Sequence, residues 1–366
     1  MRVLQAITSG QAGGAQSHVL ALCRELAGRV ELIAAIGSSP HGDDDVLGEH
    51  LQSVGVKVIR LRHMRNSTNP LRLLRAAGEL ADTIRSERPD IVHAHSSFAG
   101  AAARIAAHRC GAPCVYTVHG FGFKREARSP ARQAAWLGES LLARWTTKLI
   151  CVSQHEAQLA QRLSRPAGAI AVIANGLPDV PARADPAREP ASVATVARLA
   201  PPKRVDLLLD ALDRMAAPPP VHVIGDGPLR GELGSHAAEL GLTRVEFTGN
   251  VGDVAQRLAQ HAIFVLLSDH EGMPISILEA MRAGLAIVAS RLPGIEEMLA
   301  HEESALLVNN EAQAVADALS RLLREPQLRE RLGRAARARY ENEFDSRRMA
   351  DAVLAIYRSL TPKDLA

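Results

Sequence analysis

The feature that most constrains the fold of this chain is a regular alternation of short apolar runs with amphipathic helical patterns. In the first half the apolar runs read RVLQAIT, VELIAAIG, VKVIRL, DIVHAHS, CVYTVHG, KLICVS and IAVIANG. The segments between them include AQSHVLALCRELA and LRLLRAAGELADTIRSE, which have helical periodicity. Strands that alternate with helices in this way form a parallel sheet with helices on both faces.

The same alternation occurs a second time after a break. Residues 178–190, PDVPARADPAREP, hold four prolines and no apolar periodicity, which predicts a linker. Six further runs follow: SVATVARL, VHVIGDG, RVEFTGNV, AIFVLLSD, LAIVAS and SALLVN. We therefore expect an α/β protein with two doubly wound, Rossmann-like domains, residues 1–177 and 191–344, that face a cleft.

The C-terminal segment, residues 345–366, has helical periodicity and no strand of its own to cover. Its apolar stripe consists of Met349, Val353, Ile356 and Leu360. We expect this helix to return to the first domain.

Composition excludes several classes of protein. A net charge of +3 over 366 residues gives no bulk electrostatic support for nucleic-acid binding. The N-terminus turns polar after a short apolar run, so it predicts neither a signal peptide nor a membrane span, and we expect a cytoplasmic protein. Cys23, Cys110, Cys114 and Cys151 lie in apolar runs without zinc spacing, which predicts buried thiols in a reducing compartment.

Glycines and cations follow predicted strands. Gly10, Gly13 and Gly14 allow a ligand to approach the backbone before a helix, although their spacing is not the dinucleotide fingerprint GxGxxG. Arg198 ends a strand and Lys203 opens a helix, so both can bind a diphosphate, the alternative being two solvated surface cations.

Two carboxylates, Glu271 and Glu279, flank the start of a helix in EGMPISILEA. The backbone N–H groups around Pro274 and Ile275 favour an anion there. A carboxylate on each side of that anion can accept hydrogen bonds from the vicinal hydroxyls of a sugar. A nucleotide-sugar has this arrangement, with a diphosphate between a ribose and a hexose.

Glu271 and Glu279 resemble the EX7E motif of retaining glycosyltransferases of family 4, which have the GT-B fold. The resemblance extends to GGAQSHV, TVHGF, VARLAPPKRVD, IGDGP, FTGNV and EGMPISILEAMRAG, in the order of the family. It implies that Glu279 binds the ribose, that Glu271 lies against the donor sugar, and that the loop at Val251 holds the base. The donor-binding residues that it implies are Gly13, Gly14, Arg198, Lys203, Gly225, Asp226, Val251, Gly272, Met273, Pro274, Ile275 and Glu279.

His119 follows a strand of the first domain, where site residues of parallel sheets lie. The resemblance implies that it contacts the donor sugar as a catalytic residue together with Glu271; the alternative is a core histidine. His93 and His95 alternate along one strand, and of these two we expect His95 to face the cleft. The segment from His95 to Phe121 resembles enzymes that extend polyprenyl-diphosphate-linked sugars.

The last resemblance implies acceptor contacts from His95, Ser96, Lys124 and Arg125. Ala134, Leu137, Leu141 and Trp145 share one face of a predicted helix after a basic loop. That face has two interpretations, a core helix or a site for an anionic, membrane-held acceptor.

No metal ion or cofactor is expected. Asp43 and Asp45 match the DxD pattern of metal-dependent transferases, but they lie in a predicted acidic loop away from the other motifs. Arg198 and Lys203 supply the cations that a diphosphate needs.

The sequence thus predicts a metal-independent, retaining glycosyltransferase that moves a hexose from a nucleotide-sugar, with UDP favoured, to a glycan or lipid-linked glycan. A nucleotide-sugar epimerase of the same fold and a non-catalytic nucleotide-sugar-binding subunit are the alternatives.

Overall fold

The computed structural model describes residues 1–11, 13–38, 45–121, 130–163 and 170–361. The chain forms two compact units, one of residues 1–176 with the segment from Ser346, the other of residues 177–345. Both have a parallel sheet between helices, as predicted, and a strand forms within each of the thirteen predicted runs. The predicted linker has neither helix nor strand.

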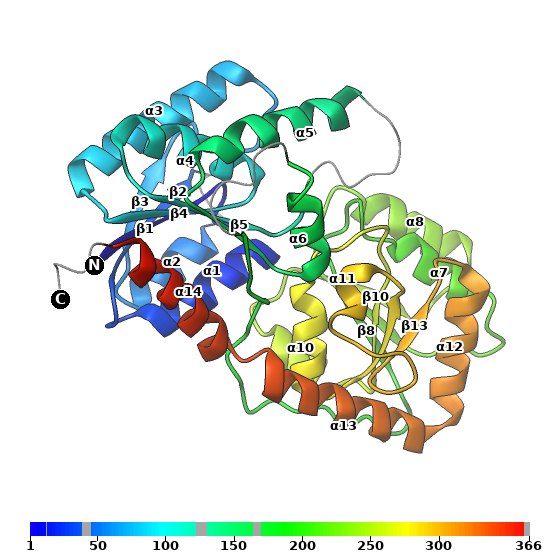
Figure 1. Cartoon of the computed structure of the whole chain (residues 1–366). Coiled ribbons are helices and arrows are strands. Elements are labelled where there is room, and N and C mark those ends of the chain that lie inside the picture. Colours follow the sequence, from blue (N-terminus) through cyan, green and yellow to red (C-terminus); the bar gives the residue numbers. More distant parts are fainter. Residues whose placement is uncertain (12, 39–44, 122–129, 164–169, 362–366) are drawn as a thin grey trace. The chain divides into compact units, whose positions relative to one another are not determined.

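The first unit contains a seven-stranded sheet in the order β3-β2-β1-β4-β5-β6-β7 (Figure 1). Its strands are β1 (Arg2–Ile7), β2 (Glu31–Gly37), β3 (Lys57–Leu61), β4 (Ile91–His95), β5 (Cys114–Val118), β6 (Lys148–Cys151) and β7 (Ile170–Val172). Its helices are α1 (Gly14–Leu26), α2 (Val46–Ser53), α3 (Pro70–Glu87), α4 (Ser97–Cys110), α5 (Pro130–Leu142), the 3₁₀ turn η1 (Ala143–Trp145), α6 (Gln154–Ala160) and α14 (Ser346–Leu360).

Alternation along the strands divides the core of this unit into two layers. Leu4 and Ala6 of β1 pack with residues of α3 and α4, whereas Val3 and Ile7 pack with residues of α1, α2 and α14. Because successive side chains of a strand point to opposite faces, each strand contributes to both layers.

The C-terminal helix returns to the first unit, as predicted. In α14, Met349, Val353 and Ile356 are buried in the layer that also contains α1, and Figure 1 shows the two helices side by side. The hydroxyl of Tyr357 reaches the sheet, where it accepts a hydrogen bond from Gln5 Nε2 at 3.0 Å and contacts His93 Nδ1.

Replacing Tyr357 with phenylalanine is expected to destabilise the protein by about 1–3 kcal/mol, because the change leaves buried polar atoms of Gln5 and His93 without their partner. The midpoint of thermal unfolding measures the effect. Arg358→Ala, on the exposed side of the same helix, is the control and should leave the midpoint unchanged. Equal midpoints for both variants would contradict the structural role of the hydroxyl.

The second unit contains a six-stranded sheet in the order β10-β9-β8-β11-β12-β13. Its strands are β8 (Val193–Val196), β9 (Val221–Ile224), β10 (Val245–Gly249), β11 (Ile263–Leu266), β12 (Ala286–Ser290) and β13 (Leu306–Val308). Its helices are α7 (Val205–Asp213), α8 (Arg230–Glu239), α9 (Val254–Leu258), α10 (Ile275–Ala283), α11 (Pro293–Glu296), α12 (Ala312–Arg324) and α13 (Pro326–Glu343).

The interpretation of α5 as a core helix is wrong. Leu137 and Leu141 are 54% and 48% exposed, and Trp145 in η1 is 36% exposed. The opposite side of α5 faces the protein, where Ala135 packs against the core and Glu139 forms an ion pair of 2.8 Å with the buried Arg104. Ala135 and Glu139 therefore hold this helix against the rest of the unit, and its large apolar side chains face solvent.

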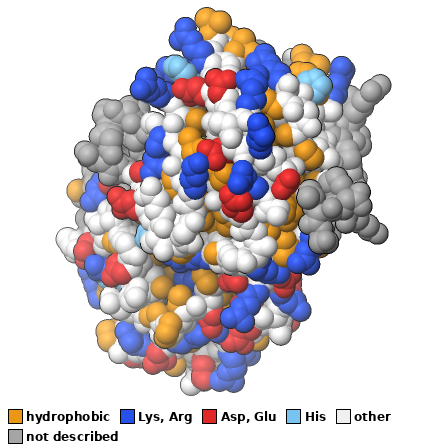
Figure 2. All heavy atoms as spheres, turned by 90° about the vertical axis from the view of Figure 1, so that its left-hand side faces the viewer, with side chains coloured by type: hydrophobic (Ala, Val, Ile, Leu, Met, Phe, Trp, Pro, Cys, Tyr) orange, Lys and Arg blue, Asp and Glu red, His pale blue; other side chains and the backbone are white. Residues whose placement is uncertain are grey.

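The surface and the cysteines agree with the composition. On the face of the molecule in Figure 2, basic and acidic side chains are interspersed, and no broad area there is basic alone. Within the residues that the structure describes, no helix combines the length and the apolarity needed to cross a bilayer. No disulfide joins the four cysteines, all of which lie in the described ranges; three are buried and Cys110 is half-buried.

Candidate functional site

The predicted donor residues of the second unit flank the point where the winding of its sheet reverses. β8 lies between β9 and β11, so the chain leaves β8 towards one edge of the sheet and returns at β11 to build the other. Arg198 and Lys203 follow β8, and Glu271 follows β11. Ligands of open parallel sheets bind beyond the carboxyl ends of the strands at such a reversal.

Lys203 and Glu271 form an ion pair there, with 2.5 Å between Lys203 Nζ and Glu271 Oε1. Their side chains are 17% and 12% exposed. Their contact is not predicted from the sequence, in which Lys203 is expected to bind the diphosphate and Glu271 the donor sugar. Arg198 lies on the same loop as Lys203 and is exposed.

Several hydrogen bonds hold the two loops that carry this ion pair against each other. The carbonyl of Pro202 accepts from Ser268 Oγ at 3.2 Å and from the backbone of Asp269 at 3.0 Å. Arg204 donates its backbone N–H to Leu267 at 3.0 Å and pairs with Asp269 at 3.1 Å. Lys203 lies between two anchored residues, so its position is set before any ligand binds.

Helix α10 begins at Ile275, four residues after Glu271. Pro274 is its N-cap residue and has extended backbone dihedrals, and Met273 and Ile275 are buried. The N–H groups of the first turn have no carbonyl one turn earlier in the helix, which favours an anion at this end. A side chain at Gly294 would overlap the carbonyl of Gly272, so the glycine allows α11 to pack tightly against this loop.

Glu279 lies in the second turn of α10. Its side chain keeps some solvent exposure, but protein atoms surround it on most sides. Burial raises its pKa to about 7, against a smaller opposing effect from Arg282. Glu279 therefore titrates near neutral pH.

Gly225, Asp226 and Val251 follow the neighbouring strands β9 and β10. Gly225 has φ +125°, and a side chain there would overlap the carbonyl of Ala197, so the backbone requires glycine. Asp226 forms an ion pair of 3.3 Å with Arg230, which places a structural contact on one of its oxygens. Val251 is half-buried in the loop after β10.

In the first unit the winding reverses between β1 and β4. Gly13 and Gly14 begin α1 after β1, and Ser96 begins α4 after β4. Ser96 has φ +69° and ψ 155°, a conformation that residues other than glycine rarely adopt. Thr8, just after β1, holds it through a hydroxyl–hydroxyl hydrogen bond. A strained residue fixed by a neighbouring strand end is typical of functional sites.

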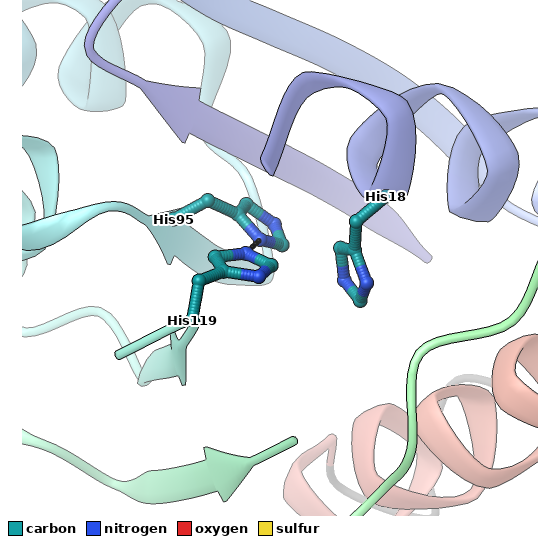
Figure 3. Close-up of side chains that lie close together, drawn as sticks. All are labelled: His18, His95 and His119. Carbon is teal, nitrogen blue, oxygen red and sulfur yellow. Dashed lines mark hydrogen bonds between the residues drawn. The ribbon is translucent and has the colours of Figure 1, made fainter. Parts of the chain in front are cut away.

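Three histidines meet at this reversal (Figure 3). His95 ends β4, His119 follows β5, and His18 projects from α1. His95 Nδ1 and His119 Nε2 lie 3.4 Å apart, and the rings of His18 and His119 meet edge to face with centroids 4.7 Å apart. His18 is not among the residues predicted from the sequence, although it lies one turn into the helix that follows the glycine loop.

His93 and His95 point to the same face of the sheet but contact different groups of side chains. Residues two apart on a strand point to the same face, and their ring centroids lie 4.2 Å apart. His93 bonds to Thr117 Oγ1 at 2.7 Å and contacts Tyr357, so it belongs to the buried network under α14.

The histidines of this group are neutral at physiological pH. Burial lowers the pKa of His18 to about 4. Burial, with nearby histidines as the smaller cause, lowers the pKa of His95 and His119 well below their usual value. His119 therefore acts as a neutral hydrogen-bonding group.

The remaining predicted residues are those of the DxD pattern and of the basic loop. Asp45 caps α2 by accepting from the backbone of Gly48 at 3.0 Å and pairs with Arg60, which explains its place in the acidic loop. Asp43, Lys124 and Arg125 lie outside the described residues.

Two models of known protein families each match one of the two parts of the chain. The family model "Glycosyl transferase 4-like domain" matches residues 13–176, and "Glycosyl transferases group 1" matches residues 181–339. The chain is 32% identical over 262 residues to an Escherichia coli UDP-Gal:alpha-D-GlcNAc-diphosphoundecaprenol alpha-1,3-galactosyltransferase, covering 65% of this chain and 67% of the relative. It is 26% identical over 395 residues to a D-inositol 3-phosphate glycosyltransferase from Jonesia denitrificans, covering 95% and 92%.

Solved structures share the fold. HepE from Anabaena, in complex with UDP and glucose, aligns with a TM-score of 0.83 at 22% identity over 98% of this chain and 100% of its own. Sucrose-phosphate synthase from Thermosynechococcus elongatus aligns with a TM-score of 0.85 at 20% identity over 98% of both chains. The GT-B fold is confirmed, and with the two family models and the galactosyltransferase relative it shows that the chain belongs to glycosyltransferase family 4.

Proposed function

We propose that this glycosyltransferase moves a hexose from a UDP-sugar to a hydroxyl of a glycan or lipid-linked glycan, with retention of configuration. The observation that carries the proposal is the Lys203–Glu271 ion pair, which lies at the winding reversal of the second unit beside the start of α10. One point then offers a cation and a helix N-terminus, which suit the diphosphate, and a carboxylate, which suits the hydroxyls of the sugar.

In this proposal residues 191–344 bind the donor. Arg198, Lys203 and the start of α10 bind the diphosphate, Glu279 accepts from the ribose hydroxyls, and Glu271 turns towards the hexose. The structure of HepE with UDP and glucose, and the E. coli relative named for UDP-Gal, favour UDP as the nucleotide.

The proposed reaction proceeds on one face of the sugar. The acceptor hydroxyl attacks from the side of the departing diphosphate, and its proton passes to a phosphate oxygen. Arg198 and Lys203 stabilise the negative charge that grows on the phosphate. Because these side chains supply the positive charge, we propose that turnover needs no metal ion, and activity is expected to persist in EDTA.

The test is a donor screen followed by NMR of the first product. Transfer from an α-linked UDP-hexose should give an α-linked product. A β linkage would contradict retention. If the donor is epimerised but not hydrolysed when no acceptor is present, the protein would be an epimerase instead. Donor binding without turnover for any acceptor would favour the non-catalytic alternative.

The raised pKa of Glu279 predicts a pH dependence of UDP binding. With a pKa of about 7, the carboxylate that accepts from the ribose is mostly ionised at pH 8 and mostly protonated at pH 6. Affinity should fall about tenfold over this interval if only the ionised form accepts both hydroxyls. UDP affinity is measured by calorimetry over the same pH range for the wild type and for Glu279→Gln, because the variant reports the effect of the titration of UDP itself. If the affinity of the variant depends on pH as that of the wild type does, the assignment of Glu279 to the ribose is contradicted.

The contribution of Glu279 to the stability of the ligand-free protein should fall as the pH rises, whereas its contribution to UDP binding should rise. Its pKa is raised in the folded state, so its contribution to the free energy of unfolding is greatest below the unfolded-state pKa. That contribution is lost as the pH rises to and through about 7.

Residues 1–177 are proposed to bind an acceptor held at the cytoplasmic face of a membrane. The exposed apolar side chains Trp136, Leu137, Leu141 and Trp145 lie on α5 and η1 of this unit. Tryptophan with aliphatic side chains on an exposed helix is typical of segments that enter a lipid interface. The E. coli relative is named for an undecaprenol-diphosphate-linked acceptor, which is in line with this proposal.

Vesicle sedimentation tests the membrane contact. The protein should sediment with anionic vesicles, and Trp136→Ser with Leu137→Ser should reduce the bound fraction several-fold. The control is Leu71→Ser on α3, which removes an apolar side chain that is 63% exposed. Equal loss in both variants would contradict a specific contact through α5.

A further inference from the structure

The geometry of His18, His95 and His119 points to a binding site for a divalent transition-metal ion such as Zn²⁺, and we propose that this ion inhibits the enzyme. The metal site itself does not depend on the proposed function; the inhibition does, because it requires His119 to contact the donor sugar.

The three side chains come from separate elements and can each offer one nitrogen, all within 4.8 Å of one another (Figure 3). Zinc binds imidazole nitrogen at about 2.0–2.1 Å with tetrahedral geometry, which separates two ligand nitrogens by about 3.3–3.4 Å. The distance of 3.4 Å between His95 Nδ1 and His119 Nε2 matches this separation.

Hydrogen bonds to amide oxygens fix which nitrogens carry lone pairs. His18 Nδ1 lies 2.9 Å from Asn175 Oδ1, so this nitrogen carries the proton and Nε2 has the lone pair. His95 Nε2 lies 2.9 Å from Gln5 Oε1, so the lone pair of His95 is on Nδ1, which accepts the hydrogen bond from His119 Nε2. On binding of an ion, the proton of His119 Nε2 would move to its Nδ1, which leaves the Nε2 lone pair for the metal. Metal-binding histidines almost always donate their second nitrogen to an oxygen in this way.

His18 Nε2 supplies an independent observation. It is buried and has no hydrogen-bond partner, although buried polar atoms nearly always have one. A metal ion would satisfy it. The lowered pKa values of the three imidazoles keep them neutral, and neutral imidazole is the form that binds a metal.

An ion at this site would have three nitrogen ligands and one open position. The ion would occupy the lone pair of His119 and hold its ring in an orientation in which it cannot contact a sugar hydroxyl. Imidazole ligands suit zinc, copper and nickel and are poor ligands for magnesium, so inhibition should be selective for the transition metals.

The first experiment measures metal binding without donor or acceptor. Protein stripped with EDTA and dialysed is titrated with Zn²⁺ in a calorimeter, and the spectrum of the Co²⁺ form is recorded. We expect one tight equivalent per chain and a tetrahedral Co²⁺ spectrum without a thiolate charge-transfer band. No tight equivalent, or a thiolate band, would overturn the proposal.

Variants locate the ion. His18→Gln should abolish the tight equivalent, and Asn175→Ala, which removes the partner that orients His18, should weaken it by about 10–100-fold. The control is His50→Gln, an exposed histidine on α2 that should bind as wild type does. Circular dichroism confirms folding of each variant, and unchanged zinc affinity in both His18→Gln and Asn175→Ala would overturn the site.

The second experiment measures inhibition by zinc, expressed for the wild type and for each variant as the fraction of its own activity without zinc that is lost. Zinc should inhibit the wild type, EDTA should restore it, and magnesium should have no effect. Zinc binding without inhibition would leave the site intact and overturn the link to His119. Absence of transferase activity with zinc binding intact would contradict the proposed function alone.

Discussion

Replacing His119 with alanine is expected to lower turnover by about 10²–10³-fold, the usual cost of removing one aligned hydrogen-bonding group from a transition state. The affinity for free UDP should change by less than about threefold, because UDP has no hexose for His119 to contact. The lowered pKa of His119 keeps it neutral, so its contribution to turnover should not titrate between about pH 6 and 8.

Glu271→Gln tests the other proposed sugar contact. It should lower turnover by a similar factor, since the amide keeps the shape of the side chain but loses its charge. UDP affinity should stay the same or rise, because Lys203 is released from its ion pair for the diphosphate. The control is His50→Ala on the exposed side of α2. Turnover of His119→Ala and Glu271→Gln near that of the control would remove both residues from the site.

Removing the positive charge of Lys203 is expected to weaken UDP binding by about 10–150-fold, which corresponds to about 1.5–3 kcal/mol for a hydrogen bond to a charged group. Lys203→Ala also leaves Glu271 without its lysine partner near the phosphates, so repulsion adds to the loss. Arg198→Ala should weaken binding by the smaller end of the same range, because its side chain is exposed.

A double-mutant cycle separates the two effects of Lys203. Lys203→Ala combined with Glu271→Gln should recover part of the affinity, since the repelling carboxylate is gone. Arg334→Ala on α13 removes a positive charge whose side chain is 76% exposed and is the control. If Lys203→Ala and Arg198→Ala both bind UDP as this control does, the diphosphate is bound elsewhere.

Much of the fold could be predicted because its signals are local. Each strand is a short apolar run, and the return of α14 follows from a stripe of Met349, Val353 and Ile356 that no neighbouring strand could cover. The edge of the sheet that carries the proposed site residues is equally predictable, since residues after parallel strands meet at one edge.

The helix at 130–142 shows where such reasoning fails. An apolar stripe predicts burial only if a protein surface is available to cover it. Here Glu139 pairs with the buried Arg104 and orients the helix the other way, so Leu137 and Leu141 face solvent. The partner of Glu139 lies 35 positions earlier in the chain, and periodicity carries no information about it.

The sequence by itself determined the strands, the family and the positions of the proposed site residues after the strands, because each depends on neighbours along the chain. Only the tertiary structure decided that Lys203 contacts Glu271 and that His18 joins His95 and His119. These contacts depend on which strands become neighbours at each winding reversal and on side-chain packing across it. Residues 68 positions apart can then form an ion pair that no local pattern encodes.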